Sequence, residues 1–425
     1  MLDKITVLVG LQWGDEGKGR MVDFLAQEAD AVVRYQGGNN AGHTVVNEFG
    51  TFKLHLIPSG IFNDKVMNIL GTGMVIDIEA LSEELEDLEK NGISTKNIRL
   101  SDRATITFPF HRLEDNLEEE RLGSAAFGST RRGIAYAYGE RYMKKSIMLG
   151  ELNYPEHLKK RITDIVEWKN LILKNVYKSD ETLNSGEILD WLNEFGGKIK
   201  DKICDTSLLL DEYYNDNKKI LFEAQLGTLR DIYYGIYPFT TSSCTLATFA
   251  PVGGGLPGKR IDNIIGVMKS FSTCVGSGPF VTEMSDEEAG QLRETAMEYG
   301  ASTGRPRRIG HFDAVATRYG ARIQGTDEIA MTKLDSLSGQ KKLKICIGYN
   351  IDGKSFNDFQ LTPGLEIAEP EYIEMDGWDE DITGCRNFTE LPKNAQDYVN
   401  KVEDLIGFKI KYISVGPERE SLIIK

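Results

Sequence analysis

A glycine-rich segment near the N-terminus carries residues that could bind and move phosphate. Gly10–Arg20 reads GLQWGDEGKGR and lies between a short apolar run and a segment with helical spacing. Glycines in such a turn let backbone N–H groups approach an anion, and the helix N-terminus adds a favourable dipole. Lys18 could reach a phosphate, and Asp15 could be a hard oxygen ligand for a divalent cation. A strict Walker A loop would need other residues at Gln12 and Gly19, and a tight turn with a solvated acidic pair is the simpler alternative.

A second loop of small and amide side chains follows the next apolar run. Gln36–Thr44 reads QGGNNAGHT, which makes a poor core segment and a good loop for close approach to a ligand. Its histidine, His43, is one of five in the chain. Paired with a carboxylate from the first loop, this imidazole could supply the acid that matches a base. A structural histidine remains the alternative.

Short apolar runs predict the strands that must position these loops. We expect strands at Lys4–Gly10, Ala31–Tyr35, Lys219–Glu223, Ile264–Met268, Ile329–Thr332, Leu343–Gly348 and Ile410–Ser414, all in one sheet. Met21–Asp30 has helical spacing, and Asp77 can cap a second helix that ends near Gly92. A strand, a helix and a second strand in succession imply right-handed crossovers and a mostly parallel sheet. Ligands bind such sheets at the strand ends, where both loops lie.

The organisation of the chain predicts one large α/β domain over residues 1–425. Residues 112–215 are charged and rich in helical patterns, and we interpret them as a helical insertion subdomain carried on the sheet. No proline- or serine-rich linker divides the chain.

Composition narrows the class of protein. The chain has 425 residues, 40% of them hydrophobic, and a net charge of -15, which disfavours binding to nucleic acid or to anionic membranes. Five scattered cysteines without a CxxC pair indicate reduced thiols and no zinc site. No segment approaches the ~18 apolar residues that a membrane span needs, so we expect a cytoplasmic protein.

Several motifs together resemble one enzyme family. WGDEGKG, RYQGGNNAGHT, HLIPSGI, TGRPRR, TKLD and SVGPER occur between Val7 and Arg419 in the order and at the separations of the adenylosuccinate synthetases. The resemblance implies a fold similar to the P-loop NTPases without a strict Walker A motif. It also implies a GTP-dependent ligation of IMP and L-aspartate to adenylosuccinate, through a 6-phosphoryl-IMP intermediate, with Mg²⁺ as cofactor. In such enzymes this is the committed step of AMP synthesis.

The resemblance assigns roles to residues of the two loops. Asp15 would take the N1 proton of IMP and also bind Mg²⁺, for which the carbonyl of Gly42 would be a second ligand. His43 would stabilise charge as the γ-phosphate moves to the purine oxygen, which is a poor leaving group until it is phosphorylated. Asn40 would contact IMP.

Two further motifs match the family's aspartate and guanine sites. In the segment ASTGRPRR, Thr303 and Arg305 would contact aspartate, because guanidinium forks suit carboxylates, and Arg307 would lie nearer the GTP. A solvated basic turn is the alternative. In TKLD, the carboxylate of Asp335 could accept from guanine N1–H and the exocyclic amine, while Lys333 stacks on the base.

The complete sets implied by the resemblance are as follows. For GTP they are Gly14, Asp15, Glu16, Gly17, Lys18, Gly19, Arg20, Gly42, His43, Thr44, Arg307, Lys333, Leu334, Asp335, Ser414, Val415 and Gly416. For IMP they are Asp15, Lys18, Asn40, Ala41, Gly42, His43, Thr130, Lys144, Gln225, Thr241 and Arg305. For aspartate they are Ala301, Ser302, Thr303, Gly304, Arg305 and Arg307.

The chain departs from the family pattern around the expected IMP site. Lys144 stands where the family has an arginine that reaches the partner's IMP across a homodimer, and lysine lacks the bidentate fork. The expected EGAQG strand end reads EAQLG, so the glutamine is displaced by one position, and either Gln225 or Leu226 could face IMP. These departures indicate a divergent branch.

Three other functions remain open at this point. A related synthetase could act on a 2-amino or deoxy 6-oxopurine nucleotide, although the members associated with such substrates lack the loop aspartate that is present here as Asp15. A GTP-binding switch would account for the TKLD motif and the phosphate turn, but not for His43 or ASTGRPRR. A homologue that has lost catalysis would have no need to keep Asp15, Lys18 and His43.

Overall fold

The core of the molecule is a ten-stranded sheet in which nine strands are parallel. A computed structural model describes residues 2–47, 49–299 and 306–425. The strand order is β20 (Leu422–Ile424), β19 (Ile410–Ser414), β15 (Glu328–Thr332), β11 (Asn263–Lys269), β1 (Ile5–Gly10), β10 (Ile220–Gly227), β2 (Ala31–Arg34), β5 (Met67–Leu70), β7 (Ile98–Ser101) and β9 (Ile203–Cys204). Only β20 at the edge runs antiparallel to its neighbour. The loops that follow the parallel strands therefore meet at one edge of the sheet.

The predicted strands are confirmed with one exception. The runs at Lys4–Gly10, Ala31–Tyr35, Lys219–Glu223, Ile264–Met268, Ile329–Thr332 and Ile410–Ser414 all fall in the central sheet. The prediction that Leu343–Gly348 belongs to the same sheet is wrong. It lies in β16 (Lys342–Ile351), which pairs antiparallel with β17 (Lys354–Phe356) and β18 (Glu369–Asp376), and parallel with β14 (Phe312–Asp313). An apolar run shows that a strand is buried, but it does not identify the strand's neighbours.

Helices cover both faces of the central sheet. Alternate residues of β1 enter different core clusters: Val7 and Val9 pack with α10 (Ala314–Gln324) and α12 (Lys393–Ile406), while Leu8 packs with α1 (Lys18–Leu25). The helix predicted at Met21–Asp30 thus begins earlier, at Lys18, and ends at Leu25, where a 3₁₀ turn takes over. The predicted cap is confirmed, since the Asp77 side chain accepts from the backbone N–H of Ala80 at the start of α2 (Ile78–Lys90).

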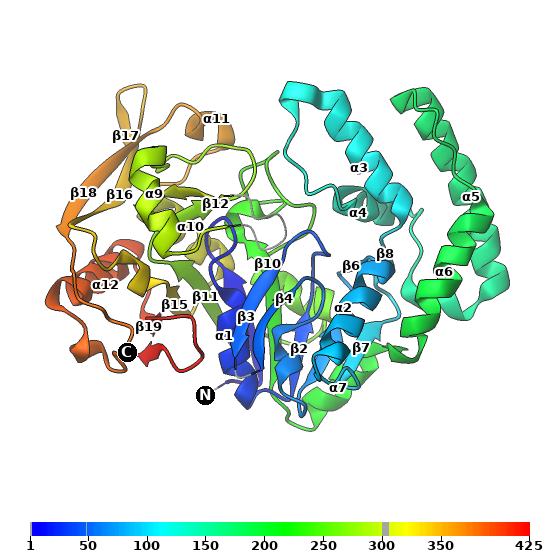
Figure 1. Cartoon of the computed structure of the whole chain (residues 1–425), viewed down its shortest axis with the longest axis horizontal. Coiled ribbons are helices and arrows are strands. Elements are labelled where there is room, and N and C mark those ends of the chain that lie inside the picture. Colours follow the sequence, from blue (N-terminus) through cyan, green and yellow to red (C-terminus); the bar gives the residue numbers. More distant parts are fainter. Residues whose placement is uncertain (1, 48, 300–305) are drawn as a thin grey trace.

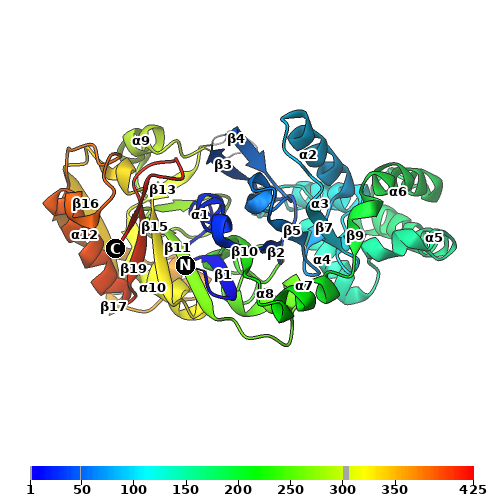
Figure 2. The ribbon, with the colours of Figure 1, turned by 90° about the horizontal axis from the view of Figure 1, so that it is seen from below.

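Helices dominate one end of the molecule. These are α3 (Pro109–Leu122), α4 (Ile134–Met143), α5 (Pro155–Ile172), α6 (Ser185–Ile199) and α7 (Thr206–Asn215). Figures 1 and 2 show α5 and α6 at the end opposite β16 and α12. Apolar side chains of α3, α5 and α6 join those of α2 in one core cluster. Because β9 lies within 112–215 and extends the central sheet, the helical part is continuous with it; its status as a subdomain stays a prediction.

Short elements complete the chain. They are the hairpin β3 (His43–Asn47) and β4 (Gly50–Leu54), the pairs β6 (Val75–Ile76) with β8 (Thr105–Ile106) and β12 (Ser272–Cys274) with β13 (Arg308–Gly310), and the helices α8 (Ala250–Gly254), α9 (Asp286–Thr295) and α11 (Thr362–Leu365). Among the described residues, no helix is both long enough and apolar enough to span a membrane.

Candidate active site

The loop between β1 and α1 is organised from within by Glu16. Its buried carboxylate accepts from the backbone N–H groups of Gln12, at 3.1 Å, and Gly14, at 2.9 Å. Lys18 Nζ lies 2.5 Å from Glu16 Oε2. The Glu16 carboxylate thus stabilises the loop from inside the protein. Because the side chain is engaged in this way, any contact of this residue with a nucleotide would come through its backbone. Asp15, by contrast, has a left-handed backbone (φ 60°) and a side chain that is 27% exposed.

Arg307 lies against Asp15. Its Nε is 3.0 Å from Asp15 Oδ2, and its Nη1 donates to Glu298 Oε2 at 2.6 Å. Burial alone would lower the pKa of Arg307, but the two carboxylates outweigh it and raise the pKa above its ordinary value. The structure thus places Arg307, which is predicted to bind aspartate and GTP, next to Asp15, the predicted base. The rest of that segment, Ala301–Arg305, lies outside the described residues.

His43 belongs to a buried chain of hydrogen bonds. Its Nε2 is 2.9 Å from Ser59 Oγ, and Ser59 donates to Glu223 Oε1 at 2.9 Å. Because the Ser59 hydrogen goes to the carboxylate, Ser59 Oγ accepts from His43, which fixes the imidazole tautomer. Burial lowers the pKa of His43 well below its ordinary value, and the charges of Arg34, His55 and Lys18 act in the same direction. The imidazole is therefore neutral near pH 7.

The first turn of α1 packs directly on this imidazole. A Cβ atom on Gly19 would lie 2.7 Å from His43 Cδ2, so only glycine allows this approach. The contact brings the two predicted loops together, since Gly19 follows the phosphate turn and His43 ends the amide-rich loop.

The loop Gln36–Ala41 is held by Gln225. The Gln225 amide accepts from Gly38 N at 3.1 Å and donates to Gly38 O at 2.8 Å and Ala41 O at 3.2 Å. The next residue, Leu226, has a left-handed backbone (φ 62°) at an irregularity between β1 and β10. Gln225 therefore faces the loop. Within the part of the chain that is described, the buried Asn40 Oδ1 has no hydrogen-bond partner, which leaves it available to a ligand.

The predicted guanine site is assembled from the ends of β15 and β19. Asp335 lies in the 3₁₀ turn Leu334–Leu337, and burial raises its pKa. Ser414 Oγ donates to Gly416 O at 3.0 Å. Arg20 on α1 ties this region to the phosphate turn by donating to the carbonyls of Glu418 and Ser421, each at 2.7 Å. Burial lowers the pKa of Arg20 to about 10.

Three members of the predicted IMP set lie less centrally. Thr130, in the loop after α3, and Lys144, at the end of α4, are exposed, and neither side chain has a hydrogen-bond partner among the described residues. Thr241 donates its backbone N–H to Arg230 O at 2.8 Å. The buried guanidinium of Arg230 in turn donates to the carbonyl oxygens of Phe239 and Ser277, so it fixes the loop that carries Thr241.

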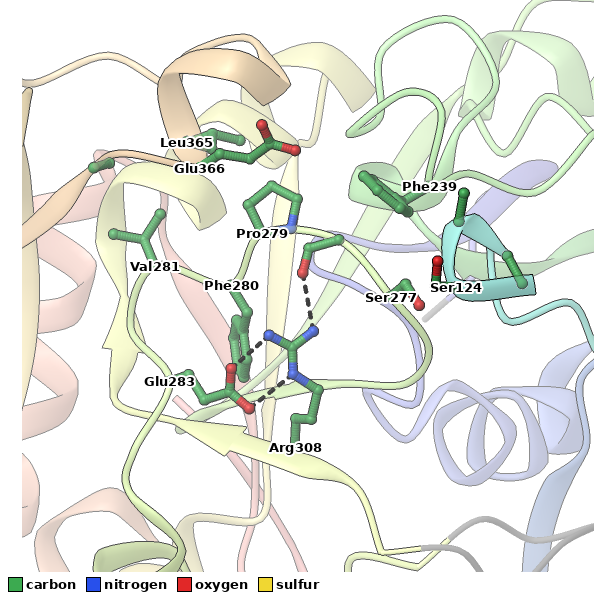
Figure 3. A pocket seen from close by; sticks show the side chains of 14 residues that line it. Ser124, Phe239, Ser277, Pro279, Phe280, Val281, Glu283, Arg308, Leu365 and Glu366 are labelled. Atoms are coloured by element: carbon green, nitrogen blue, oxygen red, sulfur yellow. Dashed lines mark hydrogen bonds and ion pairs between the residues drawn. The ribbon is translucent and has the colours of Figure 1, made fainter. Parts of the chain in front are cut away.

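A cavity of about 560 Å³ opens beside this loop (Figure 3). Arg308 lies in its wall and forms a bidentate pair with Glu283, with Nε–Oε1 at 2.7 Å and Nη2–Oε2 at 2.5 Å. Its Nη1 donates to Gly278 O at 2.9 Å. With its fork occupied in this way, Arg308 is not available to a substrate carboxylate.

Sequence reasoning missed two buried charges next to the site. Glu298 is fully buried behind Arg307, and Lys269 Nζ lies 2.8 Å from Glu298 Oε1. A signal was present for each. Lys269 directly follows the predicted strand Ile264–Met268 at the ligand-binding edge, and Glu298 comes three residues before the segment ASTGRPRR.

Comparisons with known proteins show the family to which the chain is similar. The family model for adenylosuccinate synthetase matches residues 7–423. "Adenylosuccinate synthetase 2" of Pseudoalteromonas translucida is 52% identical over 420 residues, covering 99% of both chains. The adenylosuccinate synthetase of Caldanaerobacter subterraneus is 45% identical over 423 residues, also with 99% of both chains covered.

Solved structures give the same result. The fully ligated adenylosuccinate synthetase of Plasmodium falciparum superposes with a TM-score of 0.93 at 34% identity, covering 99% of this chain and 100% of the other. A cyanophage S-2L succinoaminodeoxyadenylate synthetase, bound to dGMP and dATP, matches with a TM-score of 0.61 at 18% identity over 100% of this chain and 96% of the other, which shows a shared fold only. The chain belongs to the adenylosuccinate synthetase family.

Proposed function

We propose that this protein ligates IMP and L-aspartate to adenylosuccinate, using GTP and releasing GDP and phosphate. In a chain of this family, one observation carries the proposal most directly. Asp15, the neutral His43 and Arg307 all lie around the turn between β1 and α1, at the edge of the sheet where ligands bind. The residues needed to activate an oxygen, to stabilise charge on a phosphoryl group and to bind an anion are thus adjacent.

Asp15 serves as the base in this proposal. Its carboxylate is partly exposed and takes the N1 proton of IMP, so that O6 becomes the nucleophile. His43 is neutral because it is buried, so its single N–H, which Ser59 accepts here, would have to turn to the phosphoryl group to stabilise the charge that develops during transfer. Arg307, and Arg305 by resemblance, bind aspartate or the phosphates, while Asp335 selects guanine.

The residues present fit a Mg²⁺ ion that is completed by substrate. Among the described residues, no three His, Cys, Asp or Glu side chains gather around a possible metal position. Mg²⁺ sites commonly use one or two carboxylates together with substrate phosphates, and Asp15 with the Gly42 carbonyl matches that pattern. When bound, the ion would neutralise charge on the transferring phosphoryl group. We also propose a homodimer, in which Lys144 contacts the partner's IMP, and a cytoplasmic location.

Phosphate release from GTP tests the proposal. The complete reaction holds IMP, aspartate and Mg²⁺, and parallel reactions omit one component or replace GTP by ATP or IMP by dGMP. We expect release that requires both IMP and aspartate, together with the absorbance rise of adenylosuccinate. Release with dGMP and not with IMP would instead indicate a purine-variant synthetase, and slow hydrolysis indifferent to both substrates would indicate a GTP switch.

A further inference from the structure

Glu298 is surrounded by three cationic side chains from different elements. Arg307 Nη1 donates to Glu298 Oε2 at 2.6 Å, while Lys269 and Lys333 place their Nζ atoms 2.8 and 3.2 Å from Glu298 Oε1. Lys269 ends β11, Lys333 follows β15, and Arg307 precedes β13. One carboxylate thus joins two strand ends of the central sheet to the arginine that contacts Asp15.

Glu298 is buried, so its charge acts strongly on its neighbours. Glu298 and Lys269 are 0% and 1% exposed, so neither charge is screened by water. Burial alone would raise the pKa of Glu298, but Lys269, Lys333 and Arg307 together lower it to about 2. Burial lowers the pKa of Lys269 to about 8 in spite of its partner. The carboxylate is therefore the anion that keeps three neighbouring cations in place.

Glu298 also fixes the segment of chain that precedes β13. Its backbone carbonyl accepts from the Arg307 N–H at 3.0 Å, and Tyr299 and Pro306 form an antiparallel bridge. Glu298 and Arg307 therefore interact through both backbone and side chain. These contacts hold together the two ends of the segment that carries the proposed aspartate contacts. Without the carboxylate, Arg307 would keep only Asp15 as a charged partner among the described residues.

We propose that Glu298 is a positioning residue that orients Arg307 against Asp15 and Lys333 beside the guanine site, so that the aspartate and GTP sites form together. The proposal rests on the function proposed above. It assigns Glu298 no contact with substrate. Its effect is on substrates bound by the residues that it orients. It should change the KM for IMP less, because most of the residues proposed for IMP lie on β10 and on the loops that follow β2 and β10.

The substitution Glu298→Gln tests this role, because it keeps the shape and removes the charge. We expect the KM values for aspartate and GTP to rise about tenfold each, equivalent to about 1.4 kcal/mol, while the KM for IMP changes less than threefold. Glu114→Gln is the matched control. Glu114 is also buried and contacts a buried lysine, Lys169, but it lies on α3 in the helical part. The control should lower the thermal midpoint without changing any KM.

A second variant separates positioning from folding. Glu298→Gln leaves Lys269 buried without an anion, so Lys269→Met combined with Glu298→Gln removes that charge while Arg307 stays unoriented. We expect this double variant to recover thermal stability and to keep the raised KM values. A uniform change in all three KM values, unchanged KM values in a folded variant, or failure of both variants to fold would overturn the role of Glu298. Absence of turnover in the unmodified enzyme would instead overturn the proposed function.

Discussion

Replacing Gly37 by alanine would disturb the loop that carries Asn40. Gly37 has φ 87°, a left-handed conformation that costs an alanine about 1 kcal/mol. Its new Cβ would lie 1.7 Å from Gln225 Oε1, so the Gln225 amide would have to leave. Gln225 would then lose three hydrogen bonds to Gly38 and Ala41, at about 1 kcal/mol each. The expected loss of stability is about 4 kcal/mol.

The chain offers a control with the same backbone and no crowding. Gly92 has φ 80°, and a Cβ added there would meet no atom within 4 Å. Gly92→Ala should therefore cost only the backbone term of about 1 kcal/mol. Urea unfolding of both variants, with equal slopes, would measure the difference of about 3 kcal/mol.

Enzyme assays complete the comparison. Displacement of the loop should raise the KM for IMP in Gly37→Ala and leave it unchanged in Gly92→Ala. Equal destabilisation of the two variants would refute the argument that Gln225 supports this loop, because backbone strain would then explain both. A destabilised Gly37→Ala with a normal KM for IMP would separate loop support from substrate binding.

Two further substitutions test the proposed roles of single carboxylates. Asp15→Asn should keep the fold, as judged by circular dichroism, and lower turnover by about a hundredfold or more because the base is lost; a near-normal rate would remove Asp15 from that role. Asp335→Asn should lower the preference for GTP over xanthosine triphosphate, measured as a ratio of kcat/KM, by at least about tenfold, since an amide can donate to the xanthine oxygen. An unchanged ratio would show that another group reads the base.

The sheet and its loops were predictable because buried parallel strands leave a strong local signal. The run Lys4–Gly10 is apolar and rich in β-branched residues, and a glycine-rich turn follows it, so the position of that turn at one edge comes from topology alone. The mistake at Leu343–Gly348 has the same origin. Its burial was evident, but its partners are β14, β17 and β18 and not a strand of the central sheet, and the choice of partner is a tertiary property.

The position of Gln225 needed coordinates for a different reason. A one-residue displacement in a regular strand reverses the face of a side chain, and the sequence could not show whether the strand was regular there. The ladder shifts between Leu8, opposite Glu223, and Gly10, opposite Gly227. Leu226 absorbs part of this irregularity in a left-handed conformation, so alternation along β10 fails at the residues in question.

Part of the charge cluster at Glu298 could be predicted from the sequence, and part could not. In the ladder, Lys269 lies opposite Thr332, so Lys269 and Lys333 must emerge side by side from adjacent parallel strands. Two ammonium groups at adjacent strand ends repel each other, and the buried one, Lys269, is costly without an anion. An acidic partner was therefore required at this edge, and its identity depended on how the chain after α9 returns to the sheet. Glu298 fulfils the requirement, and because Arg307 shares it, the anion that stabilises the core also orients the site.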